Sequence, residues 1–267
     1  MRKKYILLFL SLITFQSLLG QVGVEEIEEE TYEEEEEEIV YDFDKTLMIG
    51  ANFQLGFPLD QFGDNIDVIG WGFGGNVMWQ FKRNEQLFAG IDFGYQNYDS
   101  ESRITTFGFN EEYELKTKNS MVLAHLQLRI YPKVDFFIQP YFEGLFGIKS
   151  LFTRSTEKDV FTNETFNSQF DNSDYAWSVG GAVGFEIPIQ KKYLFFEGRL
   201  AYLKGTSADY YARRPGNPNY INPLEVFELK NSATDLLMPQ IGIKFLIGFS
   251  KNSPEEYEED NYESDEY

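Results

Sequence analysis

The chain contains one side chain suited to general base catalysis near neutral pH, His125, and no cysteine. A serine hydrolase needs such a base within hydrogen-bond reach of its nucleophile. His125 lies in a run where apolar and polar residues alternate, and its next neighbour on the same face is Gln127, not a serine. The lack of cysteine excludes thiolate nucleophiles, disulfides and Cys-based metal sites. These observations favour a hydrogen-bonded structural role for His125 over catalysis.

Charged residues occur singly in several runs of this kind, and paired carboxylates among them could supply acid/base chemistry. All have the phase of the small and polar residues, as His125 does, so they are predicted to share one interior. Unpaired charges in a confined interior are costly, and equal numbers of acids and bases therefore favour an interlocking ion-pair network. The predicted members are Asp92, Glu143, Glu186, Glu197, Arg129, Arg199, Lys149 and Lys244.

The elements that carry these side chains are predicted strands. From Thr46 onward the residues alternate with period two, and the i, i+3, i+4 spacing of a helix is absent. One face of each run is bulky and apolar, whereas the other carries glycine and the charged residues. Eight runs can be marked, over residues 47–57, 71–81, 87–96, 121–130, 138–149, 177–187, 194–202 and 240–249.

The apolar face could point inward, as in a soluble calyx, or outward into lipid. Eight strands enclose an interior just wide enough to be filled by side chains, and roughly forty bulky apolar residues would overfill it. The opposite face suits a narrow polar lumen. Beyond the N-terminus, no stretch reaches the ~18 apolar residues of a membrane helix. We therefore expect an all-β fold, an eight-stranded antiparallel up-and-down transmembrane β-barrel over residues 46–250.

The spacing of the runs and the positions of tryptophan agree with this prediction. Trp71 and Trp79 lie eight residues apart on one face, which spans roughly 20 Å at ~3.3 Å per residue and ~40° tilt, close to the separation of two interfacial girdles. Short turns on one side and long loops on the other are typical of such barrels. The predicted short connections are 82–86, 132–135 and 190–192, and the long ones are 58–68, 99–119, 152–173 and 205–233.

The formal net charge of −21 belongs mainly to the two ends of the chain. Residues 22–45 carry 13 acids and one lysine, and residues 251–267 carry 8 acids and one lysine. No basic stripe exists to neutralise phosphates, so a nucleic-acid partner is excluded. Residues 1–20 have the basic start, short apolar run and small final residue of a signal peptide. We expect acidic, disordered segments at 21–45 and 251–267.

The N-terminal layout, the eight runs and the last strand together resemble the eight-stranded outer-membrane β-barrel family of the OmpX and OmpA-transmembrane-domain type, with PorT-like barrels as a looser match. The last strand is similar to that family's assembly signal, although 18 residues follow it here; the matching positions are Gln240, Gly242, Phe245, Ile247 and, at its end, Phe249. The resemblance implies the outer membrane of a Gram-negative bacterium, with both termini periplasmic. It also implies contact with outer-membrane lipid, with lipopolysaccharide and with the barrel assembly machinery.

Two long connections have compositions suited to recognition. Residues 103–116 alternate around a turn at 108–110, which predicts a ribbon with exposed edges open to β-augmentation. The connection 205–233 has the tyrosine- and arginine-rich composition of recognition sites, and its arginines could equally touch anionic lipopolysaccharide groups. Its candidate residues are Tyr210, Tyr211, Arg213, Arg214 and Tyr220.

The acidic segments could dock on a basic periplasmic partner or remain solvated flanks. No acid spacing resembles an EF-hand-type loop, so we expect no metal site and no cofactor. The sequence thus predicts a non-enzymatic outer-membrane barrel with a role in envelope structure and interaction. Two alternatives stay open. One is a lipid A-modifying enzyme, since the family includes such enzymes, although the deacylases among them resemble a His-x-Ser pattern that Gln127 breaks. The other is a small-solute channel, for which the narrow lumen is unfavourable.

Overall fold

The chain divides into two units, residues 1–39 and 40–267, and everything described below lies in the second. The computed structural model describes residues 45–81, 86–107, 111–133, 137–190, 193–216 and 220–249. The predicted signal peptide, the 21–45 segment apart from Lys45, and the 251–267 tail lie outside these residues.

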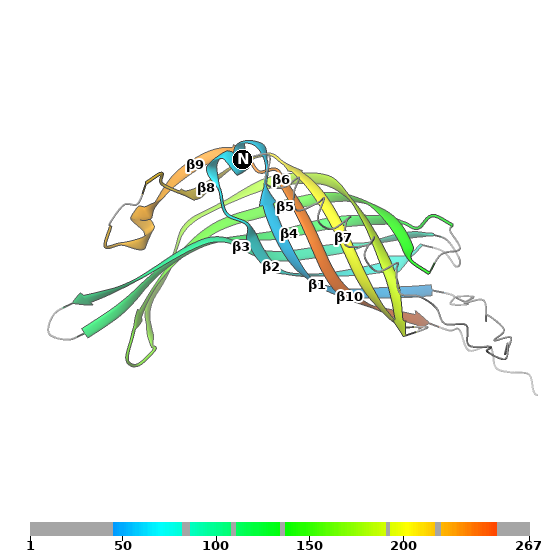
Figure 1. The fold of residues 1–267 in the computed structure, drawn as a ribbon, viewed down its shortest axis with the longest axis horizontal. Helices are drawn as coiled ribbons and strands as arrows, with labels where there is room; N and C mark the ends of the chain where they lie inside the picture. The colour runs from blue at the N-terminus through cyan, green and yellow to red at the C-terminus, as the bar shows by residue number, and fades with distance from the viewer. Residues whose placement is uncertain are drawn as a thin grey trace, which may run out of the picture. The chain divides into compact units, whose positions relative to one another are not determined.

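Eight strands form one closed antiparallel barrel, in the order β1-β10-β7-β6-β5-β4-β3-β2 (Figure 1). The first strand pairs with the last from Lys45↔Phe249 to Pro58↔Leu236, which closes the ring and removes both sheet edges. The predicted all-β eight-stranded fold is therefore confirmed. The barrel strands are β1 (Lys45–Pro58), β2 (Gly70–Gln80), β3 (Leu87–Phe107), β4 (Glu111–Ile130), β5 (Gln139–Asp159), β6 (Thr165–Gln190), β7 (Leu194–Gly205) and β10 (Leu236–Phe249).

The outward-facing side chains of the barrel wall are apolar and exposed, and the inward-facing side chains are buried, as the period-two pattern predicts. On β2, Trp71 and Phe73 are 53% and 61% exposed, whereas Asn76 and Met78 between the outward positions are buried. Successive side chains of a strand point to opposite faces, so a single phase separates the two environments along each strand. Large apolar side chains facing outward over all eight strands form the kind of surface that contacts lipid.

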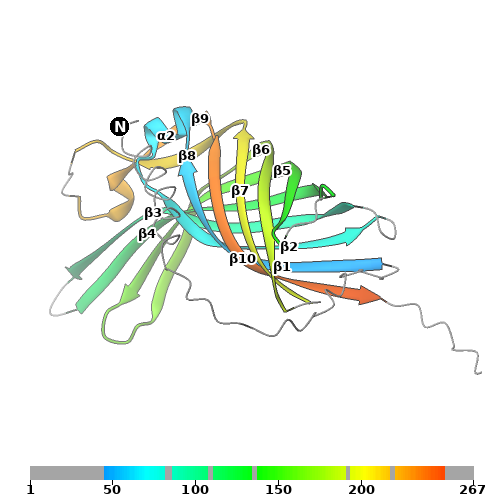
Figure 2. The ribbon, with the colours of Figure 1, turned by 45° about the vertical axis from the view of Figure 1, so that its right-hand side comes forward.

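Four strands continue beyond the barrel wall as a protruding sheet. Pairing of β2 with β3 ends at Trp71↔Asn97, and pairing of β6 with β7 begins at Ser178↔Gly205. Past these points, among the described residues of the barrel strands, only β3–β4, β4–β5 and β5–β6 pair (Figures 1 and 2). We call this part, residues 99–107, 111–119, 153–159 and 165–172, the protruding sheet.

The protruding sheet confirms one expectation and corrects another. The ribbon predicted around residues 108–110 is present, since β3 and β4 pair as far as Phe107↔Glu111. The expected loop 152–173 is wrong, because β5 runs to Asp159 and β6 begins at Thr165. Both faces of that segment carry polar residues such as Thr153 and Thr156, so it lacks the one-sided apolar alternation that marks a strand inside the membrane.

The two other long connections also contain regular structure. The short helix α2 (Asp60–Asn65) occupies the first, and among the described residues no helix is long and apolar enough to cross a membrane. The last connection forms a two-stranded sheet of β8 (Ser207–Arg213) and β9 (Phe227–Ala233), joined through the 3-10 helix η1 (Pro223–Val226). Figure 2 shows α2, β8 and β9 together at the loop end of the barrel.

Position 147 of β5 requires glycine because β4 and β5 approach each other closely there. A Cβ there would lie 2.0 Å from the Ala124 carbonyl oxygen of β4, whereas a Cβ at Gly144 of the same strand would meet nothing within 4 Å. Overpacking of this kind costs about 1–3 kcal/mol. We expect Gly147→Ala to lower the free energy of unfolding in lipid vesicles by that amount. Gly144→Ala is the matched control, and an equal loss in both variants would contradict the steric explanation.

Candidate functional site

The structure places all of the polar side chains predicted for the lumen inside the barrel, where every one is buried. They are Asp92, His125, Arg129, Glu143, Lys149, Glu186, Glu197, Arg199 and Lys244. Their alternating positions along the strands were therefore enough to predict that they face the lumen. The sequence did not predict which of these side chains contact each other. In the structure seven of them form one connected network, and His125 and Lys149 lie apart from it.

Arg129 is the centre of the network. Its guanidinium donates to Glu186 Oε1 at 2.6 Å and to Glu197 Oε1 at 2.7 Å, and it also pairs with Glu143. Lys244 Nζ donates to the same oxygen of Glu186, at 2.6 Å, and to Glu197. Two cations are thus shared among three carboxylates, which compensates charges that would be costly if buried alone.

Arg199 of β7 links the network to Asp92 of β3 and to Gln240 of β10. Its Nε donates to Glu143 Oε2 at 2.7 Å, and its Nη1 donates to Asp92 Oδ1 at 3.0 Å and to Gln240 Oε1 at 2.7 Å. We call the connected set the ionic layer. It draws on β3, β4, β5, β6, β7 and β10, and its charged members are Asp92, Arg129, Glu143, Glu186, Glu197, Arg199 and Lys244.

Lys149 was predicted to join this network, but it lies apart from it. Its ammonium donates to the backbone carbonyl of Leu203 at 3.3 Å and to that of Thr234. Lys149 sits six residues along β5 from Glu143, toward the loop end, and so beyond reach of the ionic layer. Sequence phase identifies the face of a strand but not the depth at which two side chains meet.

His125 also differs from expectation. Its Nδ1 lies 4.0 Å from Asp92 Oδ2, too far for a hydrogen bond, and neither ring nitrogen has a partner among the described residues. The prediction of a hydrogen-bonded histidine is therefore wrong for this structure. Gln127, two residues further along β4, donates a hydrogen bond to Glu143 of the ionic layer. Among the described residues, no serine or threonine hydroxyl lies within hydrogen-bond distance of either ring nitrogen.

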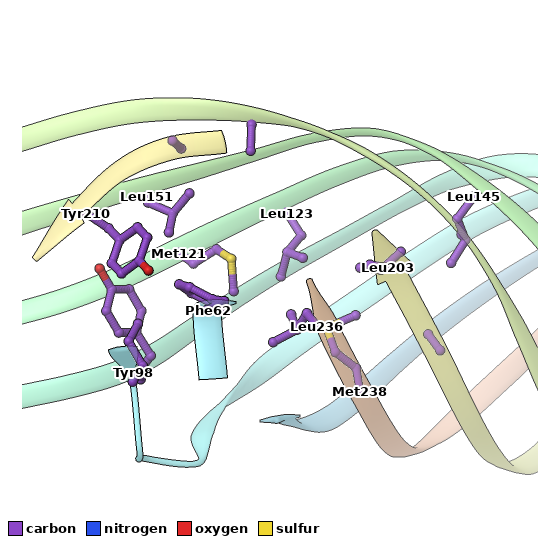
Figure 3. Close-up of a cluster of buried hydrophobic side chains, with 14 of the residues drawn as sticks. Phe62, Tyr98, Met121, Leu123, Leu145, Leu151, Leu203, Tyr210, Leu236 and Met238 are labelled. Carbon is purple, nitrogen blue, oxygen red and sulfur yellow. The ribbon is translucent and has the colours of Figure 1, made fainter. Parts of the chain in front are cut away.

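An apolar plug fills the lumen on the loop side of the ionic layer. Phe62 of α2 is 0% exposed and makes edge-to-face contacts with Tyr98 and Tyr210, at centroid distances of 6.3 and 4.9 Å. Figure 3 shows it entering from the helix among side chains of the wall. We call this cluster the loop-side plug; its larger members are Phe62, Tyr98, Met121, Leu123, Leu145, Leu151, Leu203, Tyr210, Leu236 and Met238.

A second apolar layer closes the turn side. Tyr131 Oη donates to Glu186 Oε1 at 2.7 Å and Tyr141 Oη to Glu197 Oε1 at 2.6 Å, so this layer is hydrogen-bonded to the ionic one. The guanidinium carbon of Arg129 lies 3.7 Å from the centre of the Tyr141 ring. The members of this turn-side layer are Met48, Met78, Phe88, Tyr131, Tyr141, Phe195 and Leu246.

The predicted narrow polar lumen is thus present as the ionic layer, and the structure adds an apolar cluster on each side of it. Met121 and Leu123 of β4 have the lumen-facing phase, and this was the signal in the sequence that pointed to an apolar layer. Phe62 carried no such signal, since it lies in a connection between strands. Among the described residues, no group of three or more potential ligands is placed to hold a metal ion.

The tyrosines predicted for recognition in the last connection differ in their exposure. Tyr210 is 0% exposed, and its hydroxyl lies 2.6 Å from Ser232 Oγ and accepts a hydrogen bond from Asn65 Nδ2 at 2.8 Å. Its expected role in recognition is therefore corrected to a structural one, because it faces the plug. Tyr211 is half-buried, whereas Tyr220 is 38% exposed.

The two arginines of the same connection are exposed and differently engaged. Arg213 donates to Asp99 Oδ1 at 2.8 Å and to Glu101 Oε2 at 2.9 Å, which fastens the connection to β3. These hydrogen bonds raise the pKa of the Arg213 guanidinium above its usual range. Arg214 donates through Nε to the carbonyl of Phe227 at 3.2 Å.

A cleft of about 860 Å³ opens between the protruding sheet and residues 220–225. One wall comes from β4, β5 and β6, and the other from the segment around η1. It lies outside the barrel, beside the connection that Arg213 fastens. The side chains around it are Tyr113, Leu115, Lys116, Thr117, Ser155, Thr156, Glu157, Gln169, Tyr220, Ile221, Asn222, Pro223, Leu224 and Glu225.

The predicted assembly signal forms the closing strand. Gln240 is buried and donates through Nε2 to Gln54 Oε1 at 2.9 Å, whereas Phe245 and Ile247 are exposed on the outer face. A Cβ at Gly242 would lie 2.5 Å from the Ala51 carbonyl oxygen, so the strand approaches β1 closely there. Phe249 ends β10, and its side chain lies outside what the structure describes.

No protein-family model matches the chain, and no curated protein sequence matches it. Solved structures of similar fold include the outer membrane protein OprG from Pseudomonas aeruginosa, with 13% identity over 78% of this chain and 98% of that chain and a TM-score of 0.42. Neisserial surface protein A has 9% identity over 76% and 97% with a TM-score of 0.34. Ail of Yersinia pestis, in complex with the heparin analogue sucrose octasulfate, has 12% identity over 76% and 99% with a TM-score of 0.34. The closed eight-stranded architecture itself is established by the strand pairing described above.

Proposed function

We propose that this chain, whose fold is that of the small eight-stranded outer-membrane barrels, is a closed, non-enzymatic protein of the outer membrane that acts through contacts outside its barrel. The observation that carries the proposal is the filled lumen. Charged side chains from six strands are joined in the ionic layer, with an apolar layer on each side. A barrel filled in this way offers a rigid support for its loops and no path for solutes.

The proposed orientation follows from the ends of the barrel. Lys45 pairs with Phe249, so the chain enters and leaves at the rim that carries the short turns. In this orientation the protruding sheet faces the outside, where Arg214 could meet anionic lipopolysaccharide groups. The acidic segments 21–45 and 251–267 attach at the periplasmic rim, where a basic partner could dock on them. Crosslinking from both segments in intact cells would identify such a partner.

Planar-bilayer recording distinguishes this proposal from a channel. We expect the purified full chain to give no steady conductance steps, because the ionic layer and both apolar layers occupy the lumen. A 16- to 18-stranded porin, whose wider barrel leaves an aqueous path, is the positive control. Steady steps in the nanosiemens range would defeat the proposal.

Incubation with labelled lipopolysaccharide distinguishes it from an enzyme. His125 is buried, and no described hydroxyl is hydrogen-bonded to its ring, so we expect no turnover and no difference between the native chain and His125→Ala. Turnover that disappears in His125→Ala would overturn the non-enzymatic reading.

A further inference from the structure

We propose that the cleft between the protruding sheet and residues 220–225 is a binding site for an uncharged oligosaccharide segment. The inference rests on the proposed function, since it names the ligand class that the outward-facing part would contact. The cleft's volume of about 860 Å³ falls within the ~300–1,000 Å³ of typical small-molecule sites.

The floor of the cleft is a rigid paired sheet. Thr117 of β4 pairs with Ser155 of β5, and the two hydroxyl oxygens lie 3.0 Å apart. Leu115 pairs in the same way with Glu157. The backbone groups of this floor are therefore already engaged with each other, and the cleft presents side chains rather than a strand edge. A peptide cannot add to β4 or β5 by β-augmentation, which requires unpaired backbone groups, because both strands are paired on both sides.

The roof is held in place by contacts within its own connection and with β3. Arg213 fastens the connection to Asp99 and Glu101, and Arg103 Nη1 donates to the backbone carbonyl of Tyr220. Asn222 Oδ1 accepts from the backbone amide of Leu224 at 3.0 Å and caps η1. These contacts hold roof and floor in one arrangement before a ligand arrives, which lowers the entropy cost of binding.

The chemistry of the lining fits a sugar. Ser155 presents a hydroxyl on the sheet face that also carries Leu115 and Gln169, and Gln169 and Asn222 present amides, so both donors and acceptors line the cleft. The rings of Tyr113 and Tyr220 also line the cleft. A neutral sugar offers many hydroxyls together with flat C–H faces, and it can use both kinds of surface at once. Tyrosine suits this use because it combines an apolar ring with a polar tip.

The charges of the lining argue against an anionic polymer. The residues around the cleft include two acids, Glu157 and Glu225, and one base, Lys116, which alternates to the other face of the sheet from Glu157, so acids outnumber bases. Recognition of sulfate or phosphate groups uses clusters of arginine, which this lining lacks, and excess negative charge would repel such a ligand. The lining therefore favours an uncharged ligand over a sulfated one.

The test uses the full chain in lipid nanodiscs and measures binding by calorimetry. The probes are chitotriose and maltotriose as uncharged sugars, a sulfated heparin hexasaccharide, and an uncharged Ser/Gly/Thr hexapeptide. We expect at least one uncharged sugar to bind, and its affinity to fall about tenfold in Tyr220→Ala and in Gln169→Ala. Tyr193→Ala, an exposed tyrosine beside the short turn before β7, is the matched control and should bind as the native chain does.

Several outcomes would overturn the inference: no binding of either neutral sugar, tighter binding of the sulfated sugar or of the peptide, or an equal loss in Tyr193→Ala. Heat-modifiable migration of each variant verifies that the barrel is folded. The conductance measurement separates this inference from the proposed function. A closed barrel that binds no neutral sugar defeats only the ligand assignment, whereas a conducting barrel defeats the proposed function.

Discussion

Replacing Arg129 with methionine is expected to lower the free energy of unfolding by about 3–5 kcal/mol. The substitution removes the cation that Glu143, Glu186 and Glu197 share, and leaves buried carboxylates with less compensation. Methionine keeps much of the volume, so the loss reports charge rather than a cavity. Urea unfolding of the barrel in lipid vesicles, followed by tryptophan fluorescence, measures the change.

Arg154→Met is the control for this prediction. Arg154 lies exposed on the protruding sheet, where its Nε donates to Ser168 Oγ at 2.9 Å. Its replacement should change the unfolding free energy by less than about 1 kcal/mol. Adding Glu143→Gln to Arg129→Met removes one uncompensated carboxylate and should recover part of the loss. A loss below about 1 kcal/mol in Arg129→Met would contradict the view that the ionic layer is tightly coupled.

The second large effect is expected from Phe62→Ala, at about 3–5 kcal/mol. Phe62 is fully buried in the loop-side plug, and its loss leaves a cavity between α2, Tyr98 and Tyr210. The same vesicle unfolding experiment applies. Phe161→Ala is the matched control, because Phe161 is 75% exposed at a turn and should change stability by no more than about 0.5 kcal/mol.

Conductance of Phe62→Ala tests which layer closes the lumen. We expect the variant to remain silent in planar bilayers, because the ionic layer beneath the plug is unchanged. Steady conductance in Phe62→Ala would show that the plug is the barrier and that the ionic layer conducts ions. The combination of lost stability and retained closure is therefore specific to the three-layer arrangement.

Much of the barrel could be predicted because its wall follows a strict local rule. Alternation with period two determined both the strands and the side on which Asp92, His125 and Arg129 lie, since one phase error would expose every charge to lipid. The ribbon around residues 108–110 could be predicted for the same reason. These features depend on neighbours along a strand and need no knowledge of distant contacts.

The features that the sequence did not reveal depend on contacts between distant segments. Phe62 fills the lumen only because α2 folds back over the mouth of the barrel. Tyr210 is buried because β8 carries it against Phe62, although its tyrosine- and arginine-rich surroundings are typical of an exposed recognition loop. Lys149 leaves the ionic network because the depth of a residue in the barrel depends on strand register, which composition does not determine.

The strand β10 closes the barrel against β1 and also carries Lys244 of the ionic layer, so both features depend on the same strand. Lys244 lies on the last strand to be made, and only its arrival brings the third cation to four buried acids. A chain that stops before β10, or threads that strand wrongly, has two arginines against Asp92, Glu143, Glu186 and Glu197. Its barrel would be open at the seam, and Glu186 and Glu197 would each lose one cationic partner. Loss of β10 therefore removes both the closing strand pair and one of the three cations of the ionic layer.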